Sequence, residues 1–182
     1  MHNNLLYCFT FIDGFEKEHI RKLDKKIALI YRNYSVKNDR KTILEIKKIC
    51  KENGRKFYLS NNLKLAIKLD LDGVYLPSFN KGLNVYTTTL KKKFSIIGSA
   101  HTVNEIKIKE KQGAELIFIS PLFKTKKSKR FLNTIRFNLL ALKTAKKVIA
   151  LGGINSRNLK RLSMVKASGF AGISYFKNKS NI

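Results

Sequence analysis

The clearest structural unit in this sequence is the stretch Val148-Ile149-Ala150-Leu151-Gly152-Gly153-Ile154-Asn155. A short apolar run leads into two glycines, and a residue suited to start a helix follows soon after. An apolar run without polar alternation indicates a strand that is buried on both faces, as the strands of parallel sheets are. The stretch therefore predicts a parallel strand, a tight turn and the beginning of a helix.

Short apolar runs of this kind recur along the chain and alternate with amphipathic helical patterns. We predict eight strands, at residues 6–12, 27–32, 56–60, 73–76, 95–98, 116–120, 147–151 and 171–175. We predict helices at residues 16–23, 39–52, 62–69, 103–112, 133–145 and 155–167. This alternation favours a closed α/β (β/α)8 TIM barrel over an open doubly wound sheet, because every strand is apolar enough for burial on two sides. The barrel is compact, since the first helix is short and the last is very short or missing.

Length and composition predict one globular domain over residues 1–182, because 43% hydrophobic content in 182 residues can form a sizeable core. No apolar run reaches the ~18 residues of a membrane span, and the N-terminus lacks a secretory signal pattern. We therefore expect a cytoplasmic protein without a membrane partner. Cys8 and Cys50 suit neither a disulfide framework nor a zinc site. A missing last helix would uncover the flank beside the first and last strands, which predicts a homodimer.

The formal charge of +26 raises the question of a nucleic-acid partner. Lysines are spread through nearly every segment, and only residues 124–130 concentrate them. A dispersed pattern indicates a solvated lysine surface ahead of a dedicated nucleic-acid face. We rank RNA binding last among the functions considered.

In such barrels the chemistry lies at the carboxyl ends of the strands, which we call the mouth. The residues expected there are polar: Asp13, Arg32, Asn33, Tyr34, Ser60, Asn61, Ser78, Asn80, Ser99, His101, Ser120, the loop to Arg130, Gly152, Gly153, Asn155 and residues 174–177. Of the 12 carboxylates, only Asp13 follows a strand closely. Magnesium usually needs carboxylate ligands, and acid–base catalysis by paired carboxylates needs two. We therefore predict no metal and no cofactor, and a neutral to cationic mouth for an anionic ligand.

Two features of the mouth carry alternative interpretations. Gly152 and Gly153 could expose backbone N–H groups to a phosphate beside a helix start, or could serve only a tight turn that needs positive φ. His101 could transfer a proton near neutral pH, with Ser99 pointing at the same pocket, or could merely cap the helix that begins near Thr102.

The ordered motifs of the chain resemble the thiamine phosphate synthase and TenI family. They are Leu6-Tyr7, Leu71-Asp72-Gly73-Val74-Tyr75-Leu76, Gly98-Ser99-Ala100-His101-Thr102, Gly113-Ala114-Glu115, Ser120-Pro121-Leu122-Phe123-Lys124-Thr125, Ala150-Leu151-Gly152-Gly153-Ile154 and Gly169-Phe170-Ala171-Gly172. The resemblance implies a (β/α)8 barrel that handles thiazole phosphate in thiamine biosynthesis. The synthase joins this compound to hydroxymethylpyrimidine pyrophosphate, whereas TenI-type members isomerise a thiazole carboxylate phosphate.

The sequence departs from the synthase pattern where pyrophosphate and metal would bind. The synthase segment Gln-Leu-Arg-Glu-Lys corresponds to residues 30–34, which keep Arg32 but lose the Gln and the Lys. The two presumed metal carboxylates of the family correspond to Asn61 and Asn80. A neutral amide does not offset pyrophosphate charge as a carboxylate–magnesium pair does.

The residues that the resemblance associates with thiazole phosphate match the family pattern more fully than those for pyrophosphate and metal. They imply that phosphate binds at Gly152, Gly153, Thr125, Ser128 and Lys129, that His101 transfers the proton, and that Arg32, Asn61 and Ser99 bind substrate. The leading interpretation is a TenI-like thiazole tautomerase that binds a small phosphorylated thiazole. The alternatives are a thiamine phosphate synthase with an altered metal site, for which magnesium would be needed, a non-catalytic binder of thiazole or thiamine phosphate, and an RNA-binding protein.

Overall fold

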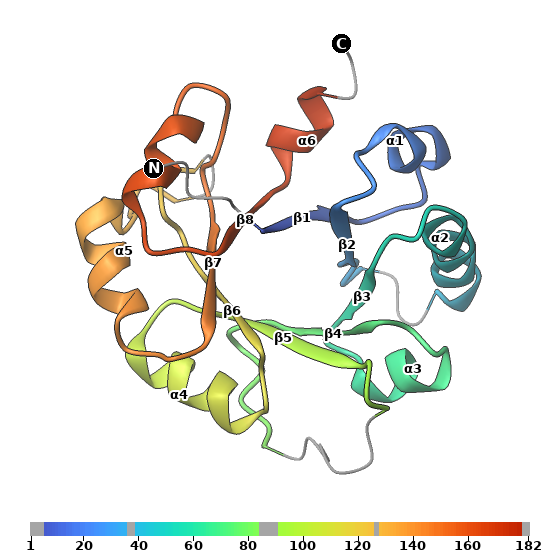
Figure 1. Cartoon of the computed structure of the whole chain (residues 1–182). Helices are drawn as coiled ribbons and strands as arrows, with labels where there is room; N and C mark the ends of the chain where they lie inside the picture. Colours follow the sequence, from blue (N-terminus) through green and yellow to red (C-terminus); the bar gives the residue numbers. More distant parts are fainter. Residues whose placement is uncertain (1–5, 36–38, 84–90, 126–127, 180–182) are drawn as a thin grey trace.

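Eight parallel strands close into a barrel in which each strand pairs with its sequence neighbours and β8 pairs with β1 (Figure 1). The computed structural model describes residues 6–35, 39–83, 91–125 and 128–179, with side chains up to residue 176. The strands are β1 Tyr7–Ile12, β2 Ile27–Tyr31, β3 Phe57–Ser60, β4 Gly73–Leu76, β5 Ser95–Ala100, β6 Leu116–Ile119, β7 Lys147–Leu151 and β8 Gly169–Gly172. The predicted (β/α)8 barrel is confirmed.

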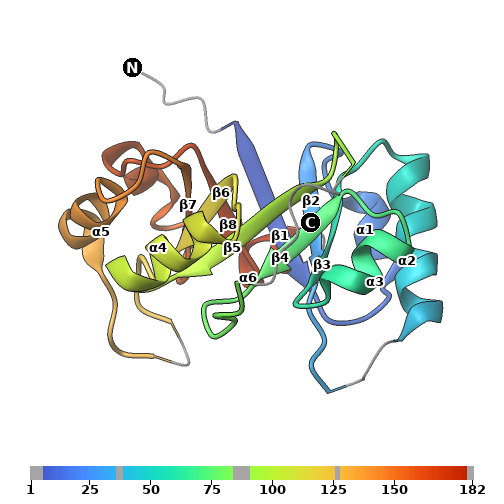
Figure 2. The same ribbon diagram turned by 90° about the horizontal axis from the view of Figure 1, so that it is seen from below.

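The helices surround this ring on its outside (Figure 1). They are α1 Lys17–Lys22, α2 Arg40–Glu52, α3 Leu63–Lys68, α4 Val103–Lys111, α5 Asn133–Ala141, the 3₁₀ helix η2 Leu159–Met164 and α6 Ser174–Lys179. Figure 2 shows the strands between α1, α2 and α3 on one side and α4 and α5 on the other. No described helix has the length and apolar character needed to cross a membrane.

Helix α2 illustrates how local sequence produces these elements. The Asp39 side chain accepts a hydrogen bond from the Thr42 N–H at 3.0 Å, which satisfies a donor that the first turn leaves unpaired. Ile43, Ile46 and Ile49 follow at helical spacing and are buried. The predicted helix 39–52 is therefore found almost unchanged.

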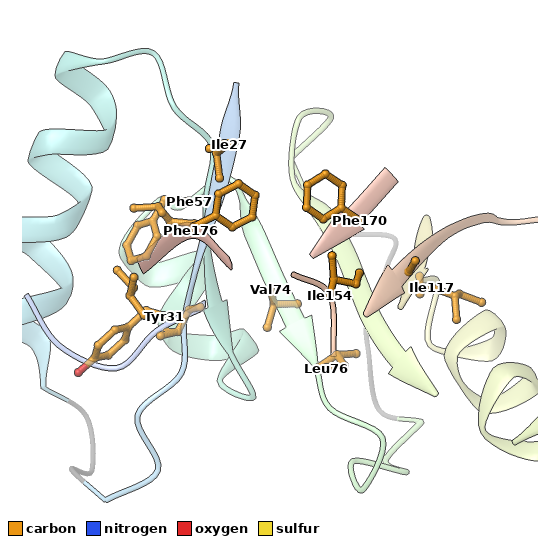
Figure 3. Close-up of a cluster of buried hydrophobic side chains, with 14 of the residues drawn as sticks. Ile27, Tyr31, Phe57, Val74, Leu76, Ile117, Ile154, Phe170 and Phe176 are labelled. Atoms are coloured by element: carbon orange, nitrogen blue, oxygen red, sulfur yellow. The ribbon is translucent and has the colours of Figure 1, made fainter. Parts of the chain in front are cut away.

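The strand predicted at residues 171–175 is wrong in its bounds. The last strand begins earlier, because Gly169 pairs with both Tyr7 and Ile149. A Cβ at Gly169 would lie 2.1 Å from the Tyr7 carbonyl oxygen, so this glycine is needed for close strand packing rather than to end a helix. The residues after β8 form the very short helix α6. Its Phe176 ring stacks on Phe170 of β8 with centroids 5.6 Å apart (Figure 3).

The helix predicted at residues 155–167 is also corrected. Residues 156–158 form a turn, and the helix that follows is the six-residue 3₁₀ segment η2. The Asn155 and Asn158 side chains bond to backbone groups within this turn, which offers the chain an alternative to a regular helix. A helix this short supplies little dipole to the mouth, so a phosphate at the double glycine would depend on the backbone of the turn itself.

The core has two layers. Inside the barrel, aromatic rings of alternating residues pack edge to face, with Phe9 and Phe118 4.9 Å apart and Phe11 and Tyr75 5.2 Å apart. Between the barrel and the helices lies a larger hydrophobic layer that includes Phe57, Val74 and Ile117 (Figure 3). The aromatic interior fills the barrel, so a ligand has to bind above it, at the mouth.

Candidate functional site

Strand periodicity decides which polar residues face the mouth. Phe11, Ile30, Tyr58, Ile97 and Phe118 point into the barrel. Because side chains alternate along a strand, the residues two positions later continue on the same side above this floor. These residues are Asp13, Arg32, Ser60, Ser99 and Ser120.

His101 follows β5 and is held by its neighbour β6. Its Nδ1 lies 2.7 Å from the Ser120 carbonyl oxygen and 3.3 Å from the Ser120 hydroxyl. A carbonyl oxygen can only accept, so in neutral imidazole the proton is on Nδ1 and the lone pair is on Nε2. The imidazole is exposed and presents a group able to accept a proton.

Helix α4 fixes the backbone of His101 without using the imidazole. Thr102 is the N-cap, and its hydroxyl accepts from the Glu105 N–H at 3.2 Å. The Glu105 carboxylate accepts from the His101 N–H at 2.6 Å. The interpretation of His101 as the cap is therefore wrong. Sequence reasoning also missed Glu105 as an acid beside the mouth, although Thr102-Val103-Asn104-Glu105 has the spacing of a capping box.

Ser99 lies one layer below His101. It is only 4% exposed. Its hydroxyl hydrogen-bonds with the Tyr75 phenol, whose pKa burial raises to about 12 and which therefore stays neutral. Ser99 thus belongs to the floor of the mouth.

The double glycine after β7 has the backbone that only glycine adopts readily. Gly152 and Gly153 have φ values of 96° and 71°. A Cβ at Gly153 would lie 2.4 Å from the Lys124 carbonyl oxygen, and one at Gly152 would lie 2.8 Å from Cα of Pro121. The Gly153 carbonyl accepts from the side-chain amides of Asn155 and Asn158. The turn therefore packs against the loop after β6, one residue beyond the Ser120 that holds His101.

The loop after β6 contains the other predicted phosphate residues. Thr125 and Ser128 bond to each other, with the Ser128 N–H donating to the Thr125 hydroxyl at 3.0 Å and the Thr125 N–H donating to the Ser128 carbonyl at 3.2 Å. Lys129 is exposed, as are Lys124 and Arg130. Residues 126 and 127 of the predicted basic cluster lie outside the described residues. Lys124 contacts the double glycine through its own carbonyl, which brings this loop and the glycine turn together.

Arg32 lies on the other side of the mouth, at the end of β2. Its guanidinium carbon is 4.5 Å from the centre of the Phe11 ring, in a cation–π contact. This contact holds a half-buried positive charge directly above the aromatic floor.

Asn61 and Asn80 follow β3 and β4, and their side chains contact each other. Asn80 Nδ2 donates to Asn61 Oδ1 at 2.7 Å. Asn80 Oδ1 accepts from Gly82 N and Gln112 Nε2, each at 3.2 Å. Both amide oxygens are thus occupied by hydrogen bonds. Among the described residues, no three His, Cys, Asp or Glu side chains form a group suited to a metal ion.

This amide pair does not fit the divalent cation that the synthase pattern implies. A hard cation needs oxygen lone pairs and favours negative charge, whereas these two oxygens already accept hydrogen bonds in a neutral pair. Tyr34 stands where that pattern has a lysine. Its hydroxyl is 3.0 Å from the Ser60 hydroxyl, and its ring packs edge to face on Phe79.

Comparison with known proteins agrees with the barrel fold. The profile of the family described as thiamine monophosphate synthase matches residues 21–176. A thiamine-phosphate synthase of Coprothermobacter proteolyticus is 30% identical over 141 residues, which cover 76% of this chain and 67% of that protein. A putative thiamine-phosphate synthase 2 of Aquifex aeolicus is 28% identical over 178 residues, covering 93% and 91%. A relative from Bacillus mycoides is matched over only 38% of its length.

A solved structure of thiamine phosphate pyrophosphorylase from Pyrococcus furiosus has the same fold. It superimposes with a TM-score of 0.75 at 20% identity, covering 94% of this chain and 87% of that one. This likeness concerns the barrel itself, and the family profile carries the assignment. The chain belongs to the thiamine phosphate synthase and TenI family.

Proposed function

We propose that this protein binds a thiazole carboxylate phosphate and acts as a TenI-like tautomerase, with His101 as the group that transfers the proton. The observation that carries the proposal is the contact of His101 Nδ1 with the Ser120 carbonyl, because in the neutral imidazole this contact holds the proton on Nδ1 and leaves the Nε2 lone pair to accept one. A tautomerisation needs one group that removes a proton from one carbon and returns it to another. No electron acceptor or second substrate is required.

The phosphate of the ligand would bind at the double glycine. The positive φ values of Gly152 and Gly153 turn the chain sharply after β7, and the backbone N–H groups of this turn would donate to the phosphate. Thr125, Ser128 and Lys129 come from the loop that packs on this turn. Lys129 would add an ammonium donor, and the two hydroxyls, which donate to carbonyls within the loop, would turn toward the phosphate when it binds. Phosphate binding there places the thiazole ring beside His101, since both sites contact consecutive residues of the loop after β6.

The carboxylate of the ligand would face the opposite side of the mouth. Arg32 supplies a positive charge fixed on Phe11, and Asn61 supplies an amide group. Both interactions strengthen when the carboxylate gains negative charge as the proton is removed. The site therefore combines an anchor for phosphate, a base and a group that steadies the developing charge.

The second candidate is a thiamine phosphate synthase with an altered metal site, which the names of the relatives favour. Two features oppose it. The oxygens of Asn61 and Asn80 are engaged in hydrogen bonds, and the lysine expected to hold pyrophosphate is replaced by Tyr34. A synthase built on this mouth would have to bind pyrophosphate without that carboxylate pair.

The two candidates are separated by a pair of assays on the same preparation. The purified protein is mixed with the thiazole tautomer, and conversion is followed spectroscopically for the wild type and for His101→Ala. A tautomerase converts the compound, and His101→Ala does not. Equal rates for both proteins would refute the role of His101. Formation of thiamine phosphate from both synthase substrates that stops on adding chelator would support the synthase instead, and calorimetric binding without either turnover would identify a non-catalytic binder.

A further inference from the structure

Lys109 of α4 is a lysine buried completely in the protein. Its exposed fraction is 0%. The stem of the side chain passes over β5 at Gly98, where a Cβ would lie only 2.7 Å from Lys109 Cδ. Gly98 therefore makes room for the lysine to reach the loop after β4, and a buried ammonium needs hydrogen-bond acceptors at its end.

The Lys109 ammonium has three acceptors there. Nζ donates to the carbonyl oxygens of Pro77 at 2.8 Å and Asn80 at 2.6 Å, and to Gln112 Oε1 at 2.9 Å. An ammonium nitrogen has no lone pair, so it can donate hydrogen bonds but cannot accept them. Its contact with Gln112 consequently fixes which end of that amide is the oxygen.

Gln112 is connected to the mouth by two further hydrogen bonds, through Asn80 to Asn61. Gln112 Nε2 donates to Asn80 Oδ1 at 3.2 Å and to the Gly82 carbonyl at 2.6 Å. Asn80 Nδ2 in turn donates to Asn61 Oδ1 at 2.7 Å. Each amide accepts on its oxygen from the preceding group and donates from its nitrogen to the next.

We propose that Lys109, Gln112 and Asn80 form a relay that orients the Asn61 amide so that its NH2 group, and not its oxygen, faces the ligand. The inference rests on the proposed function, in which Asn61 meets the carboxylate of a thiazole carboxylate phosphate. A carboxylate accepts hydrogen bonds and is repelled by an amide oxygen. The direction of the hydrogen bonds in the relay therefore decides whether Asn61 attracts or repels the carboxylate of the ligand. Lys109, Gln112 and Asn80 are positioning residues, because they act on the ligand through Asn61.

The relay also explains why Asn61 and Asn80 bond to each other at this part of the mouth. A cation bridging residues 61 and 80 would hold both side chains by their oxygens. In this protein the buried Lys109 ammonium holds the loop after β4 by donating to the Asn80 carbonyl oxygen, and the Asn61 and Asn80 side chains bond to each other directly. This part of the mouth keeps a defined geometry and presents donors to an anion.

Gln112→Glu is the sharpest test, because it preserves size, removes the amide donor and places a carboxylate against the Lys109 ammonium. Its second oxygen faces the Asn80 and Gly82 carbonyls, so the unfolding temperature of the variant is measured first. The new side chain cannot donate to Asn80. The Asn80 amide then turns its NH2 group toward the carboxylate and its oxygen toward Asn61, so Asn61 presents its oxygen to the ligand. Lys109→Met removes the origin of the relay, and Lys107→Met, which alters an exposed lysine on the same helix, is the matched control.

The readout is the preference for a carboxylate at constant phosphate. Calorimetry compares thiazole carboxylate phosphate with the same thiazole phosphate lacking the carboxylate. We expect Gln112→Glu to lose about tenfold or more in affinity for the first ligand and little for the second, and to lower kcat for the tautomer as well as raise its KM, because the Asn61 contact strengthens as the carboxylate gains charge. Lys107→Met should match the wild type. Equal losses for both ligands, or no loss, would overturn the relay.

A second readout separates the relay from the proposed function. The side-chain 1H–15N resonances of Asn61, Asn80 and Gln112 report the hydrogen bonds without any ligand. Gln112→Glu should shift the Asn61 and Asn80 signals, whereas Lys107→Met should leave them in place. If the wild type binds neither thiazole, the proposed function fails, and unshifted amide signals in Gln112→Glu would refute the relay itself.

Discussion

His101 directs its Nδ1 at the Ser120 carbonyl oxygen, 2.7 Å away, across the boundary between β5 and β6. Histidine is suited to proton transfer near neutral pH. The contact links His101 to Ser120, the first residue of the loop that packs on the double glycine. A ligand anchored by phosphate at that turn would therefore lie next to Nε2. The proposed function depends on this arrangement.

Replacing the imidazole tests its role. We expect His101→Ala to lower kcat for tautomer conversion by about 100-fold or more, because the variant lacks the imidazole that is proposed to transfer the proton. Affinity for thiazole phosphate and the unfolding temperature should stay near their wild-type values, since α4 is capped by Thr102. Conversion at the wild-type rate would remove His101 from the mechanism.

The glycine turn makes a separate prediction. Gly153→Ala should lower the free energy of unfolding by about 2 kcal/mol or more, because the new Cβ would lie 2.4 Å from the Lys124 carbonyl in a residue with φ of 71°. It should also weaken binding of thiazole phosphate. Gly14→Ala is the control, because a Cβ there meets nothing within 4 Å. Denaturant titration and calorimetry on both variants make the comparison, and equal stability of the two would contradict the account of the turn.

Much of the fold could be predicted from the sequence, because buried parallel strands leave apolar runs that local pattern detects. The last strand was misplaced because β8 begins at Gly169, a residue that local pattern interprets as the end of a helix. Its actual role is close approach to Tyr7, which lies at the other end of the chain. Contacts between residues so distant in sequence leave no periodic signal.

The site was predictable only in part, for a similar reason. Spacing placed His101 and Gly153 at the carboxyl ends of strands, and the structure shows that both contact the loop after β6. It could not indicate that Lys109 is buried, because in the sequence this residue is one lysine among many on an amphipathic helix. Nor could spacing pair Asn61 with Asn80, since that contact depends on how two loops meet.

Arg55 is a buried cation whose role is structural. Its guanidinium donates to the carbonyl oxygens of Ile20 and Leu23 at the end of α1, and to those of Asp24 and Ile27 before and in β2. Arg55→Met leaves these buried acceptors without donors, so we expect the free energy of unfolding to fall by about 2 kcal/mol or more. Denaturant unfolding is the measurement, with the exposed neighbour variant Lys56→Met as control. A stability loss no larger than that of the control would show that water replaces the guanidinium at little cost.

The buried ammonium of Lys109 makes stability depend on pH. Burial lowers the pKa of Lys109 to about 8, against the opposing effect of the Glu105 charge. The unfolded chain, with an ordinary lysine pKa near 10.4, therefore binds more protons than the folded chain between these values. Stability consequently increases as pH rises through this window. Denaturant unfolding at pH 7.5 and 9.5 should show a gain for the wild type that exceeds the gain for Lys109→Met by roughly 1 kcal/mol. Identical gains would mean that Lys109 is as easily charged in the folded protein as in the unfolded chain.

The most direct test of the central claim is the rate of thiazole tautomer conversion in the presence of excess chelator. The account predicts that the wild type converts the compound at the same rate with and without chelator, and that His101→Ala abolishes this conversion. Absence of conversion, together with chelator-sensitive formation of thiamine phosphate from the two synthase substrates, would contradict it.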